Sequence, residues 1–154
     1  MDLEAVKAGL PAQVPMVATL GLEFVDLTPT TAVMRMPDNS AYRNHVGGPH
    51  AGAMFTLGES ASGALVLANF GEHLGEVVPL AVEARIRYLK LALGPVTATA
   101  RMSRDAEDVL AELAEGKRPE FRVDIDIAAE DGTRTGEMTV VWTLKPIRPK
   151  AHPA

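Results

Sequence analysis

Residues His50–Phe70, with the sequence HAGAMFTLGESASGALVLANF, decide the fold of this chain. Nearly every position in the stretch is apolar, small or weakly polar, and Glu59 is its only carboxylate. A helix that is apolar nearly all round belongs in a protein core rather than on a surface. Burying a carboxylate is costly unless it is paired, hydrogen-bonded or protonated. The sequence therefore predicts a central helix that ends near Gly71 as its C′ residue, and Glu59 is the first candidate for chemistry.

The segments on either side of this helix alternate between apolar and polar residues, with a period of two, as half-buried strands do. Turn residues such as Thr28–Thr30 and Asp131-Gly132 separate them. Short helices are expected at 3–9, 13–19 and 105–115, the last one capped by Asp105 and ended by Gly116. The predicted strands cover residues 22–26, 31–36, 82–89, 96–102, 121–127 and 138–144.

These elements predict an α+β fold in which a curved antiparallel sheet of about six strands wraps around one long central helix. Such a sheet buries the apolar face of every strand and the helix at the same time. The length of 154 residues fits a single domain over residues 1–154, with 148–154 as a flexible tail.

Composition excludes several classes of function. A net charge of −5 and a pI near 5.3 argue against nucleic-acid binding, which usually needs a basic face. The absence of cysteine excludes disulfides, thiolate metal sites and a cysteine nucleophile. The start Met1–Glu4 does not resemble a signal peptide, and Glu59 and the glycines argue against a membrane span, so a cytoplasmic protein is expected.

The spacing between the start of the helix and Glu59 limits how they can act together. Nine residues separate His50 from Glu59, which is roughly 13 Å along a helix axis. The free amides at a helix start favour negative charge, but those of one chain lie too far from its own Glu59 to share a substrate atom. A two-fold dimer, with helices side by side, would bring one chain's helix start to the other chain's Glu59.

The loop Asn44–His50 (NHVGGPH), continuing into Ala51-Gly52 and followed by Leu57-Gly58-Glu59, resembles the signature of hotdog-fold acyl-CoA thioesterases of the PaaI-like type. That signature has Asn, a Gly three residues later, His-Gly-Gly, and an acid nine residues after the His. The resemblance implies a hotdog fold, a coenzyme A thioester substrate, and a homodimer or a dimer of dimers. We expect neither a metal ion nor a redox cofactor.

The resemblance also implies roles for individual residues. The backbone N–H of Ala51 would polarise the thioester carbonyl as an oxyanion hole. Glu59 of the second subunit would act as general base on water or as nucleophile. Asn44 would orient the water or the carbonyl, and His50 would hold the loop or bond near the thioester. Substrate-binding positions are expected at Gly47, Gly52, Phe55, Ser62, Val66, Arg85 and Arg87.

The chain departs from the signature at three positions. Ala51 stands where the signature has Gly, which keeps the backbone donor but adds a methyl group. Glu59 replaces the usual Asp and reaches one methylene further, and Ala81 replaces a hydroxyl residue often found early in the next strand. Arg85 and Arg87 are candidates for contacts to coenzyme A phosphates, although an ordinary solvated sheet face is the simpler interpretation of both.

Two other interpretations use the same residues. Hotdog dehydratases of fatty-acid synthesis carry His and Glu fourteen residues apart, as His45 and Glu59 are, but this chain has Ala51-Gly52 where those enzymes have Pro-Gly. Alternatively, the domain binds an acyl ligand without catalysis, and Glu59 has a structural role. The two histidines and Glu59 lack a familiar metal-ligand spacing, so a metal site is not expected.

Overall fold

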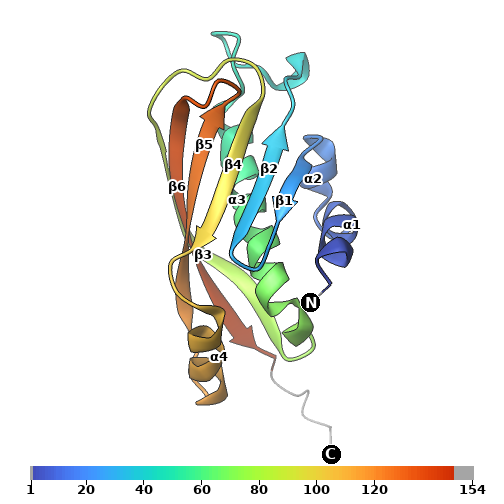
Figure 1. The fold of residues 1–154 in the computed structure, drawn as a ribbon, viewed down its shortest axis with the longest axis vertical. Helices are drawn as coiled ribbons and strands as arrows, with labels where there is room; N and C mark the ends of the chain where they lie inside the picture. Colours follow the sequence, from blue (N-terminus) through green and yellow to red (C-terminus); the bar gives the residue numbers. More distant parts are fainter. Residues whose placement is uncertain (1, 148–154) are drawn as a thin grey trace, which may run out of the picture.

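A six-stranded antiparallel sheet curves around one long helix in the computed structural model, which describes residues 2–147 (Figure 1). The strand order across the sheet is β1-β2-β4-β5-β6-β3. The elements are α1 (Leu3–Gln13), α2 (Pro15–Thr19), β1 (Glu23–Leu27), β2 (Thr31–Met36), η1 (Ser40–Tyr42), α3 (Ala51–Phe70), η2 (Gly71–His73), β3 (Val77–Tyr88), β4 (Val96–Met102), α4 (Ala106–Ala114), β5 (Glu120–Ala129) and β6 (Arg134–Pro146). The predicted fold class is confirmed, and the tail expected at 148–154 lies outside the described residues.

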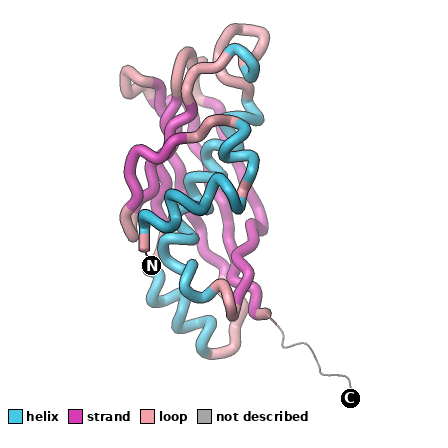
Figure 2. The backbone as a smooth tube through the Cα atoms, turned by 90° about the vertical axis from the view of Figure 1, so that its right-hand side faces the viewer, coloured by secondary structure: helices cyan, strands magenta, loops and turns pink. Residues whose placement is uncertain are grey.

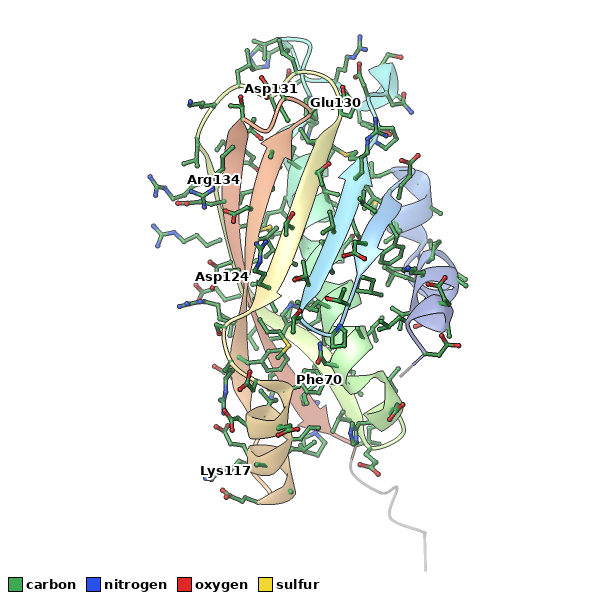
Figure 3. The ribbon with its side chains drawn as sticks, in the orientation of Figure 1. Phe70, Lys117, Asp124, Glu130, Asp131 and Arg134 are labelled. Carbon is green, nitrogen blue, oxygen red and sulfur yellow. The ribbon has the colours of Figure 1, made fainter. Side chains whose placement is uncertain are left out.

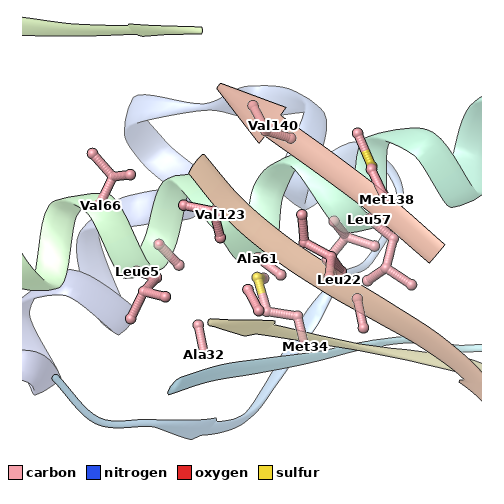
Figure 4. Packing of buried hydrophobic residues seen from close by; sticks show 14 of the residues in the cluster. Leu22, Ala32, Met34, Leu57, Ala61, Leu65, Val66, Val123, Met138 and Val140 are labelled. Atoms are coloured by element: carbon pink, nitrogen blue, oxygen red, sulfur yellow. The ribbon is translucent and has the colours of Figure 1, made fainter. Parts of the chain in front are cut away.

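The central helix α3 packs one side against the concave face of the sheet. Leu57, Ala61 and Leu65 are fully buried at a spacing of four residues, and they belong to the same hydrophobic core as Val123 and Val140 of the sheet (Figure 4). By length and composition the segment Ala51–His73 would also suit a membrane span, but 61% of its apolar 18-residue window is buried inside the protein. It therefore serves this domain as its core helix.

The end of α3 differs from the prediction. Gly71 is not a left-handed C′ residue, because its φ of −62° is right-handed. Its N–H donates to the Leu67 carbonyl, and the chain continues into the 3-10 turn η2. This tighter turn continues the hydrogen bonding of the backbone past the end of α3, so no residue in the left-handed conformation is needed there.

The inner strands match the predicted alternation closely. β2 and β4 have the predicted bounds, and the edge strand β1, outside this inner group, is shifted by one residue. The apolar positions predicted to face inward on β5 and β6 are all buried: Phe121, Val123, Ile125 and Ile127 on β5, and Met138, Val140, Trp142 and Leu144 on β6. These strands have neighbours on both sides, so the pattern in the sequence translates directly into burial.

Strand β3 is the exception. It begins at Val77 rather than Val82, and its register shifts between Ala81 and Glu83. Val82 and Tyr88, predicted to face the core, are 49% and 47% exposed. The reason is its position, since β3 pairs only with β6 and forms an edge of the sheet. Pro79, which has no N–H to donate, is typical of such an edge.

Helices α1 and α2 form a short layer beside β1 and pack against α3; in Figure 2 the helices lie in front of most of the strands. The Asp2 carboxylate caps α1 by accepting from the N–H groups of Glu4 and Ala5. The helix then continues four residues past the predicted end and includes Pro11. Burial of Leu10 outweighs the local penalty for a proline inside a helix.

Helix α4 is an insertion between β4 and β5 at one end of the sheet (Figure 1). Asp105 occupies the predicted N-cap position but makes no capping hydrogen bond with its side chain. Gly116 has a φ of +80°. Its N–H donates to Leu113 and that of Lys117 to Glu112, the pair of bonds that defines a Schellman end.

Candidate functional site

Glu59 projects from the middle of α3 into a cavity of about 230 Å³. The side chain is partly buried, and within residues 2–147 its carboxylate has no hydrogen bond and no ion pair. Burial raises the pKa of the Glu59 carboxyl above its ordinary value of 4.5. A partly dehydrated carboxylate without a partner is a candidate proton acceptor, because raised basicity favours proton transfer near neutral pH.

Three parts of the fold build the cavity around this carboxylate. Its walls come from the α1–α2 layer, from α3 and from the strands β3 and β6. The lining residues besides Glu59 are Leu10, Gln13, Val14, Val17, Ser60, Gly63, Val66, Leu67, Pro79 and Trp142. Of the three α3 residues predicted to line an acyl site, Val66 lies in this cavity, whereas Phe55 and Ser62 do not line it. In Figure 4, Leu65 and Val66 project from opposite sides of the helix.

The loop before α3 is held by the Asn44 side chain. Its Oδ1 accepts hydrogen bonds from the N–H groups of Val46 and Gly48, both at 3.1 Å, and its Nδ2 donates to the Pro49 carbonyl at 3.2 Å. Gly47 has a φ of +83°, a conformation that favours glycine. Asn44 therefore shapes the loop that presents the start of the helix.

The backbone donors at the start of α3 are not all paired within the described residues. His50 is the N-cap, and its Nδ1 accepts a hydrogen bond from the Gly52 N–H at 2.9 Å. The neighbouring Ala51 N–H has no intramolecular partner among the described residues, as expected for the first residue of a helix. Tyr88 donates from its hydroxyl to the Ala51 carbonyl at 2.8 Å, which fixes this residue from the other side.

Ala51 lies in a different cavity from Glu59. This second cavity has a volume of about 370 Å³, and its lining residues are Asn44, Pro49, Ala51, Met54, Tyr88, Leu89, Lys90, Leu91 and Ala92. Eight residues of helix separate Ala51 from Glu59, which is about 12 Å of rise. One chain thus contains a free donor and a free carboxylate at two separate places.

Arg85 and Arg87 lie on the outer face of the sheet, away from both cavities. With Arg122 and Arg134 they border a hollow of about 580 Å³, which Asp124, Asp126 and Glu137 also line. Figure 3 labels Asp124 and Arg134 on this part of the sheet. Arg87 pairs with Glu137 at 2.8 Å. Opposite charges are therefore interspersed across this face.

His45, the histidine of the dehydratase interpretation, lies in the loop before α3. Its side chain is exposed and lines neither of the two cavities.

Sequence reasoning missed several residues of these sites. Tyr88 ends an alternating strand and was predicted to be a core residue, so nothing marked its hydroxyl as a partner of Ala51. Trp142 had the same core pattern. Leu10 follows the helix predicted at 3–9 and Val14 lies in the helical segment predicted at 13–19, so nothing marked either as a cavity residue. The reason for a glycine at position 48 is visible only in the structure. A Cβ atom there would collide with the Ala92 carbonyl oxygen.

No group of three or more His, Asp or Glu side chains within residues 2–147 is arranged to hold a metal ion.

Solved structures with the same architecture include several thioesterase-family proteins. A protein of unknown function from Pseudomonas aeruginosa, described as a probable thioesterase, is 27% identical with a TM-score of 0.82, over 96% of this chain and 97% of that chain. A thioesterase family protein from Silicibacter pomeroyi is 22% identical with a TM-score of 0.73, over 94% and 99%. The PaaI protein of the E. coli phenylacetic acid degradation operon is 16% identical with a TM-score of 0.72, over 95% and 94%.

A comparison with curated protein sequences finds no significant match. The family described as a domain of unknown function, DUF4442, matches residues 3–144. The chain therefore belongs to the DUF4442 family and has the hotdog fold of thioesterase-family proteins, PaaI included.

Proposed function

We propose that this protein is a cytoplasmic acyl-CoA thioesterase that works as a homodimer or a dimer of dimers. The observation that carries the proposal is the pair of free groups on α3: the Glu59 carboxylate in one cavity and the Ala51 N–H in another. Each is suited to one half of thioester hydrolysis. The P. aeruginosa protein, a probable thioesterase over almost the same length, supports the reaction class.

Because about 12 Å of helix rise separates the Ala51 backbone from the Glu59 backbone, the proposed site needs a second copy of the chain. Strand β3 offers the surface for it, because it is a twelve-residue edge strand with exposed Val78, Leu80 and Val82. An exposed apolar edge is a template for pairing with another strand. Pairing of two β3 strands about a two-fold axis would set the two copies of α3 side by side, with Glu59 of one copy opposite Ala51 of the other.

In the proposed reaction, Glu59 takes a proton from water as the water oxygen bonds to the thioester carbon. The carbonyl oxygen becomes an oxyanion and accepts a hydrogen bond from the Ala51 N–H at the positive end of the helix dipole. When the tetrahedral intermediate collapses, the C–S bond breaks and the thiolate receives the proton held by Glu59. The products are the carboxylic acid and coenzyme A, without a metal or redox cofactor.

The remaining residues have supporting roles in this proposal. Asn44 and Gly47 give the loop its shape, and His50 with Gly52 holds the helix start so that the Ala51 N–H stays free. Arg85 and Arg87, on the strand that continues to Tyr88, would meet the phosphates of coenzyme A. Because Arg87 is already paired with Glu137, we expect Arg85 to contribute more.

A panel of acyl-CoA substrates tests the proposal, with detection of free thiol for the wild-type protein and for Glu59→Gln. We expect hydrolysis by the wild type and a loss of at least about a hundredfold in kcat/KM for the variant, a typical contribution of a general base. For the wild type, kcat/KM should fall as the pH is lowered through the raised pKa of Glu59.

Two other results would contradict the proposal and point elsewhere. Tight acyl-CoA binding without thiol release from any substrate would indicate a non-catalytic binding module. Hydration of an enoyl thioester, abolished by His45→Ala, would indicate a dehydratase-type reaction.

A further inference from the structure

We infer that the cavity beneath α1 and α2 receives the acyl group and that Trp142 sets its depth, so that the preferred substrates carry a compact, uncharged acyl group of about eight non-hydrogen atoms. This inference rests on the proposed function, because Glu59 opens into this cavity. The volume of about 230 Å³ holds roughly seven or eight non-hydrogen atoms if each takes about 30 Å³, the share of a water molecule in the liquid.

The lining determines the chemical character of the group. Leu10, Val14, Val17 and Trp142 give it apolar walls, and none of the described lining residues is a lysine or an arginine. A second carboxylate on the acyl chain would lose its hydration without gaining a partner, and Glu59 would repel it. A medium straight chain or a phenyl-sized group fits this cavity, and a dicarboxylic acyl group does not.

The Trp142 ring is a fixed wall rather than a mobile side chain. Its Nε1 donates to the Ser62 Oγ at 3.1 Å, and Ser62 in turn donates to the Glu59 carbonyl at 2.7 Å. The side chain is 8% exposed. A hydrogen-bonded, buried indole has one orientation, so the volume that it leaves is fixed as well.

Gly63 lies opposite this ring and keeps the cavity open. A Cβ atom at Gly63 would stand 3.6 Å from the ring, an ordinary contact distance, so a side chain is tolerated there by the backbone. Any larger side chain would occupy space in the cavity that Gly63 lines. Gly63 and Trp142 therefore form a matched pair: enlarging the first shortens the cavity, and reducing the second deepens it.

The test measures kcat/KM for straight-chain acyl-CoAs of two to sixteen carbons, for phenylacetyl-CoA and for glutaryl-CoA, in three proteins. We expect a medium-chain optimum in the wild type and at least tenfold poorer use of glutaryl-CoA than of a straight chain of equal length. Trp142→Phe should move the optimum about two or three carbons longer, because three ring atoms are removed and leave a cavity. Gly63→Val should move it shorter.

A second readout separates the failure of this inference from the failure of the proposed function. Calorimetry measures the binding affinity of the same acyl-CoAs for Glu59→Gln, alone and combined with each cavity variant. These affinities rank the chain lengths without hydrolysis. Hydrolysis with the same ranking in all proteins, or an optimum at sixteen carbons, would overturn the inference and leave the proposed function intact. If no acyl-CoA is hydrolysed but Trp142→Phe shifts the ranking of chain lengths in binding, the proposed function fails and the inference about the cavity stands.

Folding is checked by thermal melting of each variant. If Trp142→Phe does not fold, Val14→Phe replaces it, since Val14 is 38% exposed at the α1–α2 junction and lines the same cavity. Narrowing at this position should reduce kcat/KM for medium chains at least tenfold and spare acetyl-CoA. An equal effect on both substrates would overturn the inference.

Discussion

At the scale of single residues, Glu59 combines burial with the lack of a partner. The carboxylate has lost part of its hydration, and no cation or donor within residues 2–147 compensates for it. Such a residue costs folding free energy whenever it is charged. Proteins retain destabilising polar groups where function requires them, so the stability cost is itself an argument for a chemical role.

This cost gives a pH-dependent prediction. Because the pKa of Glu59 is raised in the folded state, the folded protein binds more protons than the unfolded one between the two pKa values, and stability falls as pH rises through that window. Glu59→Gln removes the charge, so its melting temperature should exceed that of the wild type at pH 8. Each kcal/mol gained in the free energy of unfolding should raise the melting temperature by about 2–4 °C.

Calorimetry at pH 8 and at pH 4 makes the comparison. The difference should shrink at the lower pH, which lies below the ordinary pKa of 4.5, because Glu59 is then mostly protonated in both states. A Glu59→Gln protein that is less stable than the wild type at pH 8 would show that the carboxylate has a stabilising partner, and the argument for a free base would fail.

At the scale of elements, the predictions succeeded where a segment has neighbours on both sides. Thr31–Met36 and Val96–Met102 were predicted to the residue because each is an inner strand, so alternation equals burial. The failures lie at boundaries set by tertiary contacts. β3 was misjudged at Val82 because an edge strand buries only part of each face. The predicted end of α1 came too early because burial of Leu10 in the core extends the helix.

For the candidate site, too, the sequence predicted the parts that local contacts build and not those that tertiary contacts build. Motif residues placed the Asn44 loop and the start of α3 correctly, since local hydrogen bonds of Asn44 and His50 build them. The roles proposed for them still await tests. The cavity walls could not be predicted, because Leu10 and Trp142 are far apart in the sequence and meet only through the fold.

One contact between elements gives a direct test of how the loop before α3 is held. The Gly48 backbone approaches the Ala92 carbonyl so closely that a methyl group does not fit. Gly48→Ala should destabilise the protein by about 1–3 kcal/mol, the usual range for overpacking. Thermal or denaturant unfolding measures the loss.

Gly75→Ala is the matched control. A Cβ atom at Gly75 meets no atom within 4 Å, and its φ is not positive. This variant should be neutral or slightly stabilised by the lower entropy of its unfolded chain. Equal stability of Gly48→Ala and the wild type would mean that the two loops separate readily in solution.

At the scale of the whole molecule, the two edges of the sheet are unequal. β1 is five residues long, and α1 packs against it, whereas β3 has twelve residues and a row of exposed aliphatic side chains. Natural proteins usually shorten, charge or cover an edge strand that must stay unpaired. β3 has a charged half but leaves Val78–Val82 apolar.

This asymmetry predicts an association that charges on β3 disrupt. Light scattering should give the wild type twice or four times the 16.4 kDa mass of the chain. Leu80→Lys combined with Val82→Lys should shift the mass toward that of a single chain, because paired strands would bring like charges together. Thiol release should fall in parallel if the proposed site is shared between copies.

Val25→Lys is the control at the opposite edge, since Val25 is 59% exposed on β1. Its mass should equal that of the wild type. A wild-type protein with the mass of one chain at micromolar concentration, or dissociation caused by Val25→Lys alone, would contradict association through β3.

The indole described as a cavity wall has an optical consequence. Trp142 is the only tryptophan in the sequence, so the intrinsic fluorescence of the protein comes mainly from that wall. Emission wavelength and intensity should report directly whether the cavity contains water or an apolar guest. The native chain thus carries its own spectroscopic label for ligand screening, at the place where the acyl chain is proposed to lie.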